Sequence, residues 1–236
     1  MSKSAFTVGL LFLLLATPAL AGTVNKSIKV GAGEVADGAS SVNGSITVGE
    51  GAQVTGDVST VNGSIRVDTG ATIESASTVN GGVRVADKVQ AEDLETVNGT
   101  IRVGEASVID GYIEAVNGRI KVGKGSTVAS DVENVNGEIQ LVGAEIGGDV
   151  STVSGDIYLT DEAVVNGNIV VEKPGGWSWG KKRRTPRIVI GPGSRVEGVI
   201  DVEYEVDLFI SETASVGGVH GKMSMDDAVR FSGDKP

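Results

Sequence analysis

Four cations recur at a nearly constant spacing in this chain, at steps of 18 or 19 residues: Arg66, Arg84, Arg102 and Lys121. Each directly follows an aliphatic residue, as in "TVNGSIRV", residues 60–67. A fold that brings them together would present a row of positive charge able to bind a polyanion, such as a charged envelope glycan. The alternative is a solvated face whose long side-chain stems cover the strands, with acids such as Glu95, Glu114 and Glu133 nearby.

A second candidate binding site lies in the segment "EKPGGWSWGKKRRTPR", residues 172–187. It holds the two tryptophans of the chain and a run of four cations: Trp177, Trp179, Lys181, Lys182, Arg183 and Arg184. Aromatic rings beside cations suit membrane surfaces, lipid head groups or glycans. Alternatively, the rings pack on the side of the fold and the basic run is simply solvated.

The sequence offers little for catalysis. It has one histidine, His220, and no cysteine, so histidine-dependent acyl transfer and thiol chemistry lack their residues. A glycan lyase or hydrolase could work with carboxylates alone, but no pair stands out among 31 Asp and Glu residues. The acids also form no calcium-binding repeat. We therefore predict no catalytic residue, no metal site and no cofactor.

An internal repeat must position these residues. Its signature is a Val-Asn-Gly corner whose asparagines return every 18 or 19 residues: Asn43, Asn62, Asn80, Asn98, Asn117 and Asn136. Self-similarity at a fixed period of this length indicates a solenoid. The recurrence also favours a structural role for the asparagines, since a catalytic residue is needed once and a corner on every turn.

Within each repeat, apolar or small residues alternate with polar ones, and this pattern returns every six residues. In one unit the inward set is Ile46, Val48, Ala52, Val54 and Val58. Alternation with one buried face is typical of short strands. Three such faces per unit predict a single-domain, all-β, three-sided parallel β-helix over residues 22–221. Coil starts at positions 28, 46, 65, 83, 101, 120, 139, 157, 188 and 206 give about ten coils. The spacing fits left-handed and right-handed coils alike.

The Asn-Gly corner has an expected physical basis. Both residues tolerate positive φ, and stacked asparagine amides at the strand spacing can hydrogen bond along the stack. We therefore expect an asparagine ladder running along one edge of the rod.

Two segments depart from the repeat. Residues 172–187 exceed the normal coil length and are expected to leave the β-helix as a loop. Residues 222–236 form a polar C-terminal tail that either folds over the last coil or stays disordered. The first coil begins almost at once after residue 22, with little sequence available to cap it.

The N-terminus reads as a cleavable signal peptide over residues 1–21, with an apolar run from Val8 to Leu15 and an Ala-Leu-Ala site. We therefore expect export to the periplasm or the cell surface. The net charge of −11 disfavours general nucleic-acid binding. No segment reaches the length of a transmembrane span.

The stretch from residue 188 to residue 221, "IVIGPGSRVEGVIDVEYEVDLFISETASVGGVHG", resembles the bactofilins, polymer-forming bacterial proteins with a β-helical core. The "TVNGSIRV" units also resemble exported, adhesin-like β-strand repeats. The resemblance extends over residues 28–221 and implies a β-helix that polymerises.

These observations lead to three functional hypotheses. The first is a non-catalytic, exported scaffolding protein of the bacterial cell envelope that associates with itself end to end. The second is an adhesin-like module that binds an anionic glycan or membrane surface. The third is a glycan-active β-helix enzyme.

Overall fold

The computed structural model describes residues 22–174 and 184–236. The expected signal peptide, residues 1–21, lies outside the described residues. So do Trp177, Trp179 and Lys181–Arg183 of the inserted segment.

Short alternating triplets form the strands of the repeat. In Ile65-Arg66-Val67 the two aliphatic side chains are buried and the arginine is exposed. β-Branched residues favour extended backbone and pack well on a pleated surface. The same triplet pattern returns one coil later at Val83–Val85, in parallel register with the first. Each coil therefore adds one strand to a growing parallel sheet.

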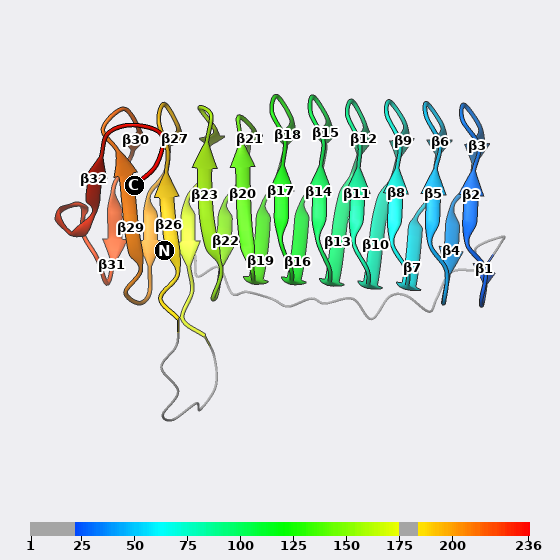
Figure 1. The fold of residues 1–236 in the computed structure, drawn as a ribbon, viewed down its shortest axis with the longest axis horizontal. Coiled ribbons are helices and arrows are strands. Elements are labelled where there is room, and N and C mark those ends of the chain that lie inside the picture. The colour runs from blue at the N-terminus through cyan, green and yellow to red at the C-terminus, as the bar shows by residue number, and fades with distance from the viewer. Residues whose placement is uncertain (1–21, 175–183) are drawn as a thin grey trace.

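Each coil visits three sheets in turn, and the coils stack along the long axis of the molecule (Figure 1). In the described residues, sheets A and B have eleven strands each and sheet C has ten. Neighbouring strands pair in parallel in all three sheets. The prediction of a three-sided parallel β-helix is therefore confirmed.

Sheet A carries the strands that lead into the Val-Asn-Gly corner. They are β1 (Gly22–Thr23), β4 (Ala39–Ser41), β7 (Val58–Asn62), β10 (Ser75–Asn80), β13 (Asp93–Asn98), β16 (Ile113–Asn117), β19 (Val132–Asn136), β22 (Val150–Thr152), β25 (Ile169–Val171), β28 (Ile200–Val202) and β31 (Val219–Gly221).

Sheet B follows that corner and carries the repeating cations. Its strands are β2 (Ile28–Val30), β5 (Ile46–Val48), β8 (Ile65–Val67), β11 (Val83–Val85), β14 (Ile101–Val103), β17 (Ile120–Val122), β20 (Glu138–Val142), β23 (Asp156–Thr160), β26 (Arg187–Ile190), β29 (Asp207–Ser211) and β32 (Val229–Phe231).

Sheet C consists of two-residue strands. They are β3 (Val35–Ala36), β6 (Gln53–Val54), β9 (Thr72–Ile73), β12 (Gln90–Ala91), β15 (Val108–Ile109), β18 (Thr127–Val128), β21 (Glu145–Ile146), β24 (Val164–Val165), β27 (Arg195–Val196) and β30 (Ser215–Val216).

The interior is a continuous stack of aliphatic side chains. Ile65, Ile101 and Ile120 of sheet B are fully buried, as are Leu94 and Ile113 of sheet A. They belong to one hydrophobic cluster that runs from Val30 to Val219. Since no coil encloses a separate core, each coil is stabilised by the coils on either side of it.

The Val-Asn-Gly corner forms the ladder of amides, and Asn25 extends it by one rung. The Nδ2 of Asn62 donates to Oδ1 of Asn43 at 2.8 Å, and that of Asn80 donates to Asn62 at 3.0 Å. The same bond joins each later asparagine to the one before, as far as Asn136.

The expected reason for the Asn-Gly pair is wrong, however. None of the corner asparagines adopts positive φ, and most of the corner glycines do not either. Glycine is required instead by a close approach between coils. A Cβ on Gly81 would lie 1.9 Å from the carbonyl oxygen of Gly63, and one on Gly99 would lie 1.8 Å from that of Gly81. Any side chain here would force the coils apart.

The predicted coil starts agree with the strands of sheet B except at the last position. Ile188 pairs with Leu208, not with the predicted Val206. The corner between β28 and β29 is longer than predicted and includes Tyr204, whose hydroxyl donates to the carbonyl oxygen of Val153 at 2.5 Å. A six-residue count cannot detect such a local insertion.

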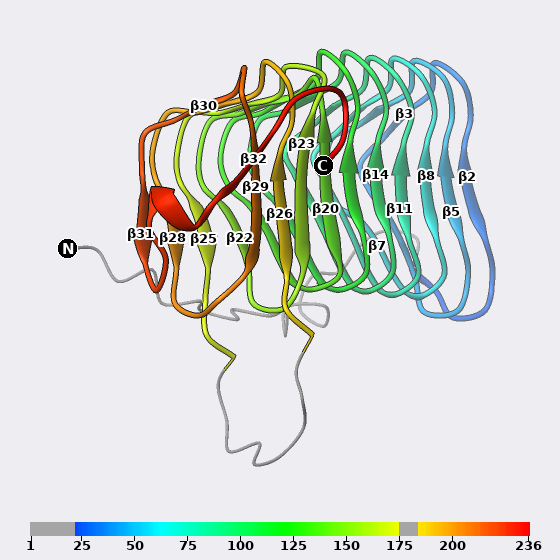
Figure 2. The same cartoon turned by 60° about the vertical axis from the view of Figure 1, so that its left-hand side comes forward.

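The two ends of the described rod differ. At the C-terminal end, residues 222–231 fold across the last coil through a short 3₁₀ helix, η1 (Met225–Asp227), and β32 (Figure 2). Met223, Met225 and Ala228 pack against the core, and Phe231 is buried. At the N-terminal end, Val24 and Val35 are each 65% exposed. The tail is therefore a cap, since its apolar residues cover the end of the core.

Candidate functional site

The repeating cations lie in one straight row on the outer face of sheet B. Parallel register pairs Arg66 with Arg84, Arg84 with Arg102, and Arg102 with Lys121. Adjacent members are thus one strand spacing apart, about 4.8 Å at the backbone. We call Arg66, Arg84, Arg102 and Lys121 the cation row. Thr47 precedes it, Lys29 lies one strand further out, and Gln140 follows it.

The cation row is poorly neutralised. Arg66 pairs with Asp68, Nε to Oδ1, at 2.7 Å. Within residues 22–174 and 184–236, Arg84, Arg102 and Lys121 form no ion pair. The three arginines are exposed and Lys121 is partly exposed. A row of like charges at this spacing is repulsive unless water or an added anion separates the members.

Glu95, Glu114 and Glu133, which we expected beside the cations, form a row of their own on the outer face of sheet A. Register pairs Glu95 with Glu114 and Glu114 with Glu133. We call these three residues the acid row. Within the described residues they form no ion pair with the cations. The shared pattern "E-x-V-N" marked the row in the sequence, because each acid stands three residues before an asparagine of the ladder.

The acid row is half-buried, which changes its ionisation. Burial, and next the Glu114 carboxylate, raise the pKa of Glu133 from its usual 4.5 to about 7. Asp131, Glu172 and Asp149 add further repulsion. Burial and Glu95 also raise the pKa of Glu114. Near neutral pH Glu133 is therefore protonated in a larger fraction of molecules than an isolated carboxyl group would be.

Glu95 has a hydrogen-bond donor of its own. The hydroxyl of Tyr112, in the preceding corner of the next coil, donates to Oε1 of Glu95. Burial, followed by this bond to a carboxylate, raises the pKa of the Tyr112 hydroxyl, which stays protonated at physiological pH. Glu95 of the acid row thus has a hydrogen-bond partner within the protein. In the cation row, Arg84, Arg102 and Lys121 form no ion pair with any residue that the structure describes.

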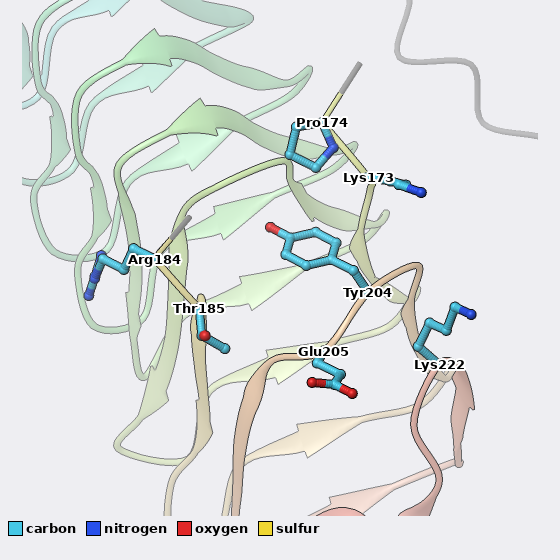
Figure 3. Close-up of a pocket in the computed structure, with 7 residues that line it drawn as sticks. All are labelled: Lys173, Pro174, Arg184, Thr185, Tyr204, Glu205 and Lys222. Carbon is cyan, nitrogen blue, oxygen red and sulfur yellow. The ribbon is translucent and has the colours of Figure 1, made fainter. Parts of the chain in front are cut away.

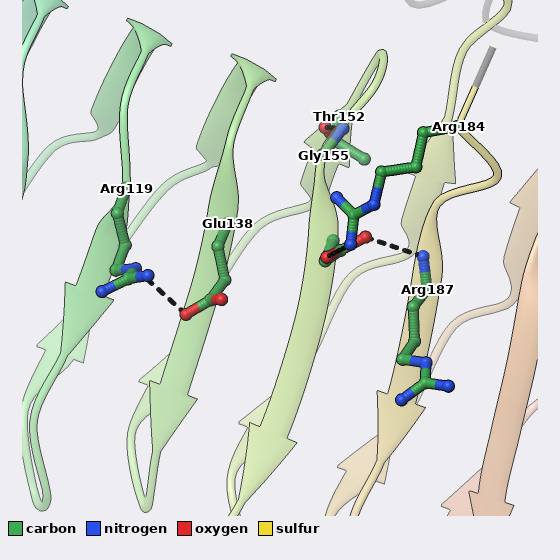
Figure 4. A network of polar contacts seen from close by, with 7 residues as sticks. Arg119, Glu138, Thr152, Gly155, Arg184 and Arg187 are labelled. Carbon is green, nitrogen blue, oxygen red and sulfur yellow. Dashed lines mark hydrogen bonds and ion pairs between the residues drawn. The ribbon is translucent and has the colours of Figure 1, made fainter.

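The base of the inserted loop is anchored by a buried acid. Asp156, only 5% exposed, accepts from Nη2 of Arg184 at 2.5 Å and from the backbone N–H of Arg187 at 2.9 Å (Figure 4). A nearby pair, Arg119 with Glu138 at 3.1 Å, links two coils of the same sheet. Arg184 therefore has a partner within the protein, although its side chain remains 72% exposed and its place among the binding cations stays a prediction. The other predicted binding residues of this loop, Trp177, Trp179, Lys181, Lys182 and Arg183, lie outside the described residues.

A hollow of about 450 Å³ opens beside the base of this loop. Its lining is Lys173, Pro174, Arg184, Thr185, Tyr204, Glu205 and Lys222 (Figure 3). The Arg184 side chain points away from Tyr204 in this view, toward its partner Asp156. The backbone N–H of Lys173 donates to Oε2 of Glu203 at 2.8 Å, which ties the start of the loop to the corner that holds Tyr204 and Glu205.

His220 is exposed on the last strand of sheet A, in register with Asp201. The described ranges contain no group of three or more His, Cys, Asp or Glu side chains arranged to hold a metal ion. None of the described helices is long and apolar enough to cross a membrane.

Comparison with known protein families, with curated proteins and with solved structures finds no match for this chain.

Proposed function

We propose that the protein is a non-catalytic structural rod that associates with a second copy through its N-terminal end and serves as a scaffold in the bacterial cell envelope. The continuous aliphatic core supports a structural role, because it makes a stiff element from many identical contacts. The apolar leader at residues 1–21 supports export.

The observation that carries the proposal is the difference between the two ends. At the C-terminal end β30, β31 and β32 are the outermost strands, but the tail that includes η1 packs Met223, Met225 and Ala228 against the end of the core. At the other end, after removal of residues 1–21, the outermost strands of the three sheets are β1, β2 and β3. Outermost strands present unpaired N–H and C=O groups that readily pair with another chain. The exposed Val24 and Val35 add apolar surface at the same end.

The same asymmetry suggests the form of the assembly. Two N-terminal ends that meet about a two-fold axis bury the same surface on both copies, which is the usual geometry of a homodimer. The closed C-terminal ends then lie outermost. Growth into longer filaments requires the C-terminal cap to open.

Sedimentation velocity on residues 22–236, with negative-stain images of the same sample, tests this proposal. We expect a concentration-dependent dimer of twice the length of one rod. Val35→Lys places a charge at the open end and should shift the equilibrium to monomer. Val229→Lys is the matched control, since Val229 is 53% exposed at the closed end. Deletion of residues 222–236 should convert dimers into longer rods.

Two results would contradict the proposal. One is a monomer at every concentration for the unsubstituted chain. The other is equal loss of association in the Val35→Lys and Val229→Lys variants, which would show that the contact does not involve the N-terminal end.

A further inference from the structure

We infer that the cation row of sheet B is a binding track for a linear polysaccharide that carries carboxylates on successive sugars. The inference does not depend on self-association, because the track lies on the side of the rod and the proposed contact lies at its end.

The spacing of the row suits an extended glycan. Arg66, Arg84, Arg102 and Lys121 are in direct register on four neighbouring strands, so they repeat at about 4.8 Å along the rod. One sugar of an extended chain advances by a similar length. A polysaccharide with one carboxylate per sugar can therefore place successive carboxylates against successive cations without bending.

The flanks leave this path open beside Arg84 and Arg102. On one side of the row, the preceding positions are small residues such as Ser64 and Gly82, with Ser64 Oγ accepting a long hydrogen bond from the Gly82 N–H at 3.5 Å. On the other side, the positions after Val85 and Val103 are Ala86 and Gly104. The larger flanking side chains lie at the two ends of the row, where Asp68 pairs with Arg66 and where Arg119, beside Lys121, pairs with Glu138.

The residue types favour carboxylates as the ligand groups. Three of the four cations are arginines, whose planar guanidinium matches a carboxylate better than the point charge of lysine does. Arg66 already shows this contact within the protein, since its Nε donates to the Asp68 carboxylate at 2.7 Å. Arg84 and Arg102 have alanine and glycine where Arg66 has Asp68, so a carboxylate from outside can take that place.

The surroundings of the row argue against a membrane as the partner. The row is one residue wide, and the chain as a whole carries a net charge of −11. A flat anionic surface would meet the acids of neighbouring corners as well as the cations, whereas a single polysaccharide chain contacts the row alone. Single-stranded nucleic acid is also a poorer fit, because from Arg66 to Lys121 the row and its flanks offer no aromatic platform for bases.

The test measures binding of fluorescent galacturonate oligomers of increasing length to the purified full chain at low salt. We expect affinity to rise with length until the oligomer matches the four cations, and to fall as salt is added. The double variant Arg84→Glu and Arg102→Glu should weaken binding by about tenfold or more, because two exposed ion pairs are lost and two repulsions replace them.

Matched variants separate the row from overall charge. Lys124→Glu with Arg195→Glu changes the net charge by the same amount at exposed positions outside the row and should alter affinity by less than about twofold. Arg84→Lys with Arg102→Lys keeps the charge and should weaken binding by a few-fold, since the planar contact is lost. Thermal unfolding of each variant checks that the rod is intact.

Five results would overturn the inference. The first three are no binding of the galacturonate oligomers, equal loss of affinity in the row and control double variants, and equal binding of neutral dextran. The fourth is row-dependent binding to phosphatidylglycerol vesicles without binding to the oligomers, which would assign the row to a membrane surface. The fifth is stronger binding of dextran sulfate than of galacturonate, which would assign the row to a sulfated polysaccharide.

Discussion

The cation row and the acid row are built from the same repeat but differ in their surroundings. Both place like charges one strand spacing apart on neighbouring coils. The arginines stand out from sheet B and are exposed, while the glutamates of sheet A are half-buried. A carboxyl group can relieve repulsion by taking up a proton, and the raised pKa of Glu133 shows this. An arginine stays charged, so only solvent or an added anion can relieve the cation row.

The comparison teaches that repetition alone does not decide what a charged row does. In the acid row, burial makes the unprotonated state unfavourable, and Tyr112 supplies a donor from within the protein. The cation row has neither feature within the described residues, apart from the Arg66–Asp68 pair. We therefore expect the acid row to make the stability of the protein depend on pH. The cation row is expected to bind an external partner.

The largest expected effect comes from the corner that holds both rows in register. A Cβ at position 99 would lie 1.8 Å from the Gly81 carbonyl oxygen, so Gly99→Ala should destabilise the protein by roughly 3 kcal/mol or more. Chemical denaturation would measure this. Thr100→Ala at the neighbouring exposed position is the control and should change stability by less than about 0.5 kcal/mol. Similar stabilities for the two variants would mean that the coils can separate locally without penalty.

Glu133→Gln should stabilise the protein at pH 8. The pKa of Glu133 is about 7 in the folded protein against 4.5 in the unfolded chain, so folding favours the protonated form. Stability of the unsubstituted protein should therefore rise as the pH falls from 8 toward 5, because the folded state binds the proton first. Solvent screening at this half-buried site reduces the gain from the substitution to about 1–2 kcal/mol at pH 8.

At pH 5 the same substitution should have little effect, since Glu133 is then protonated in the folded protein. Unfolding curves at both pH values would measure the difference. Arg84→Gln in the cation row is the matched control and should show no such pH dependence. If Glu133→Gln raised the free energy of unfolding as much at pH 5 as at pH 8, the stabilisation would not come from the ionisation of Glu133.

Tyr112→Phe should destabilise the protein by about 1 kcal/mol, because it removes a donor to the Glu95 carboxylate. Tyr158→Phe is the control, since the Tyr158 hydroxyl forms no hydrogen bond with any residue that the structure describes. Equal effects of the two substitutions would show that the acid row draws no support from Tyr112. Urea denaturation at pH 7 is the appropriate measurement.

Arg84→Gln should have the smallest effect, a gain of about 0.5 kcal/mol at low salt from relief of repulsion by Arg66 and Arg102. The gain should vanish at about 1 M salt, where the screening length is only about 3 Å. Lys124→Gln, outside the row, controls for the loss of one cation. A loss of stability at low salt would indicate that Arg84 makes a favourable contact in the unliganded rod.

The repeat allowed most of the architecture to be predicted. Steps of 18 and 19 residues between asparagines located the coils, and alternation around residues such as Ile65 and Val67 identified the buried face. The straight row of cations followed from the same count. The prediction was wrong at Val206, because the longer corner containing Tyr204 interrupts the six-residue period.

Three features of the site depend on contacts between separate coils, which the sequence does not show. The sequence placed Arg184 with the binding cations and gave no sign that the buried Asp156 accepts a hydrogen bond from it. The acids that were expected near the cations lie on another sheet. For the tail at residues 222–236 the sequence left two alternatives open, and the contacts of Met223, Met225 and Phe231 show that the tail folds over the last coil.

The sequence by itself determined the β-helix, the length of the regular coils of 18 or 19 residues and the lateral register of the two charged rows. It did so because inward aliphatic residues and the glycine corner must recur once per coil for the coils to stack. Only the tertiary structure decided which row is half-buried, what contacts it and which end is closed. These properties depend on how much solvent reaches a side chain and which residues from other coils surround it, as when Glu172 approaches Glu133. No regular spacing along the chain records that arrangement.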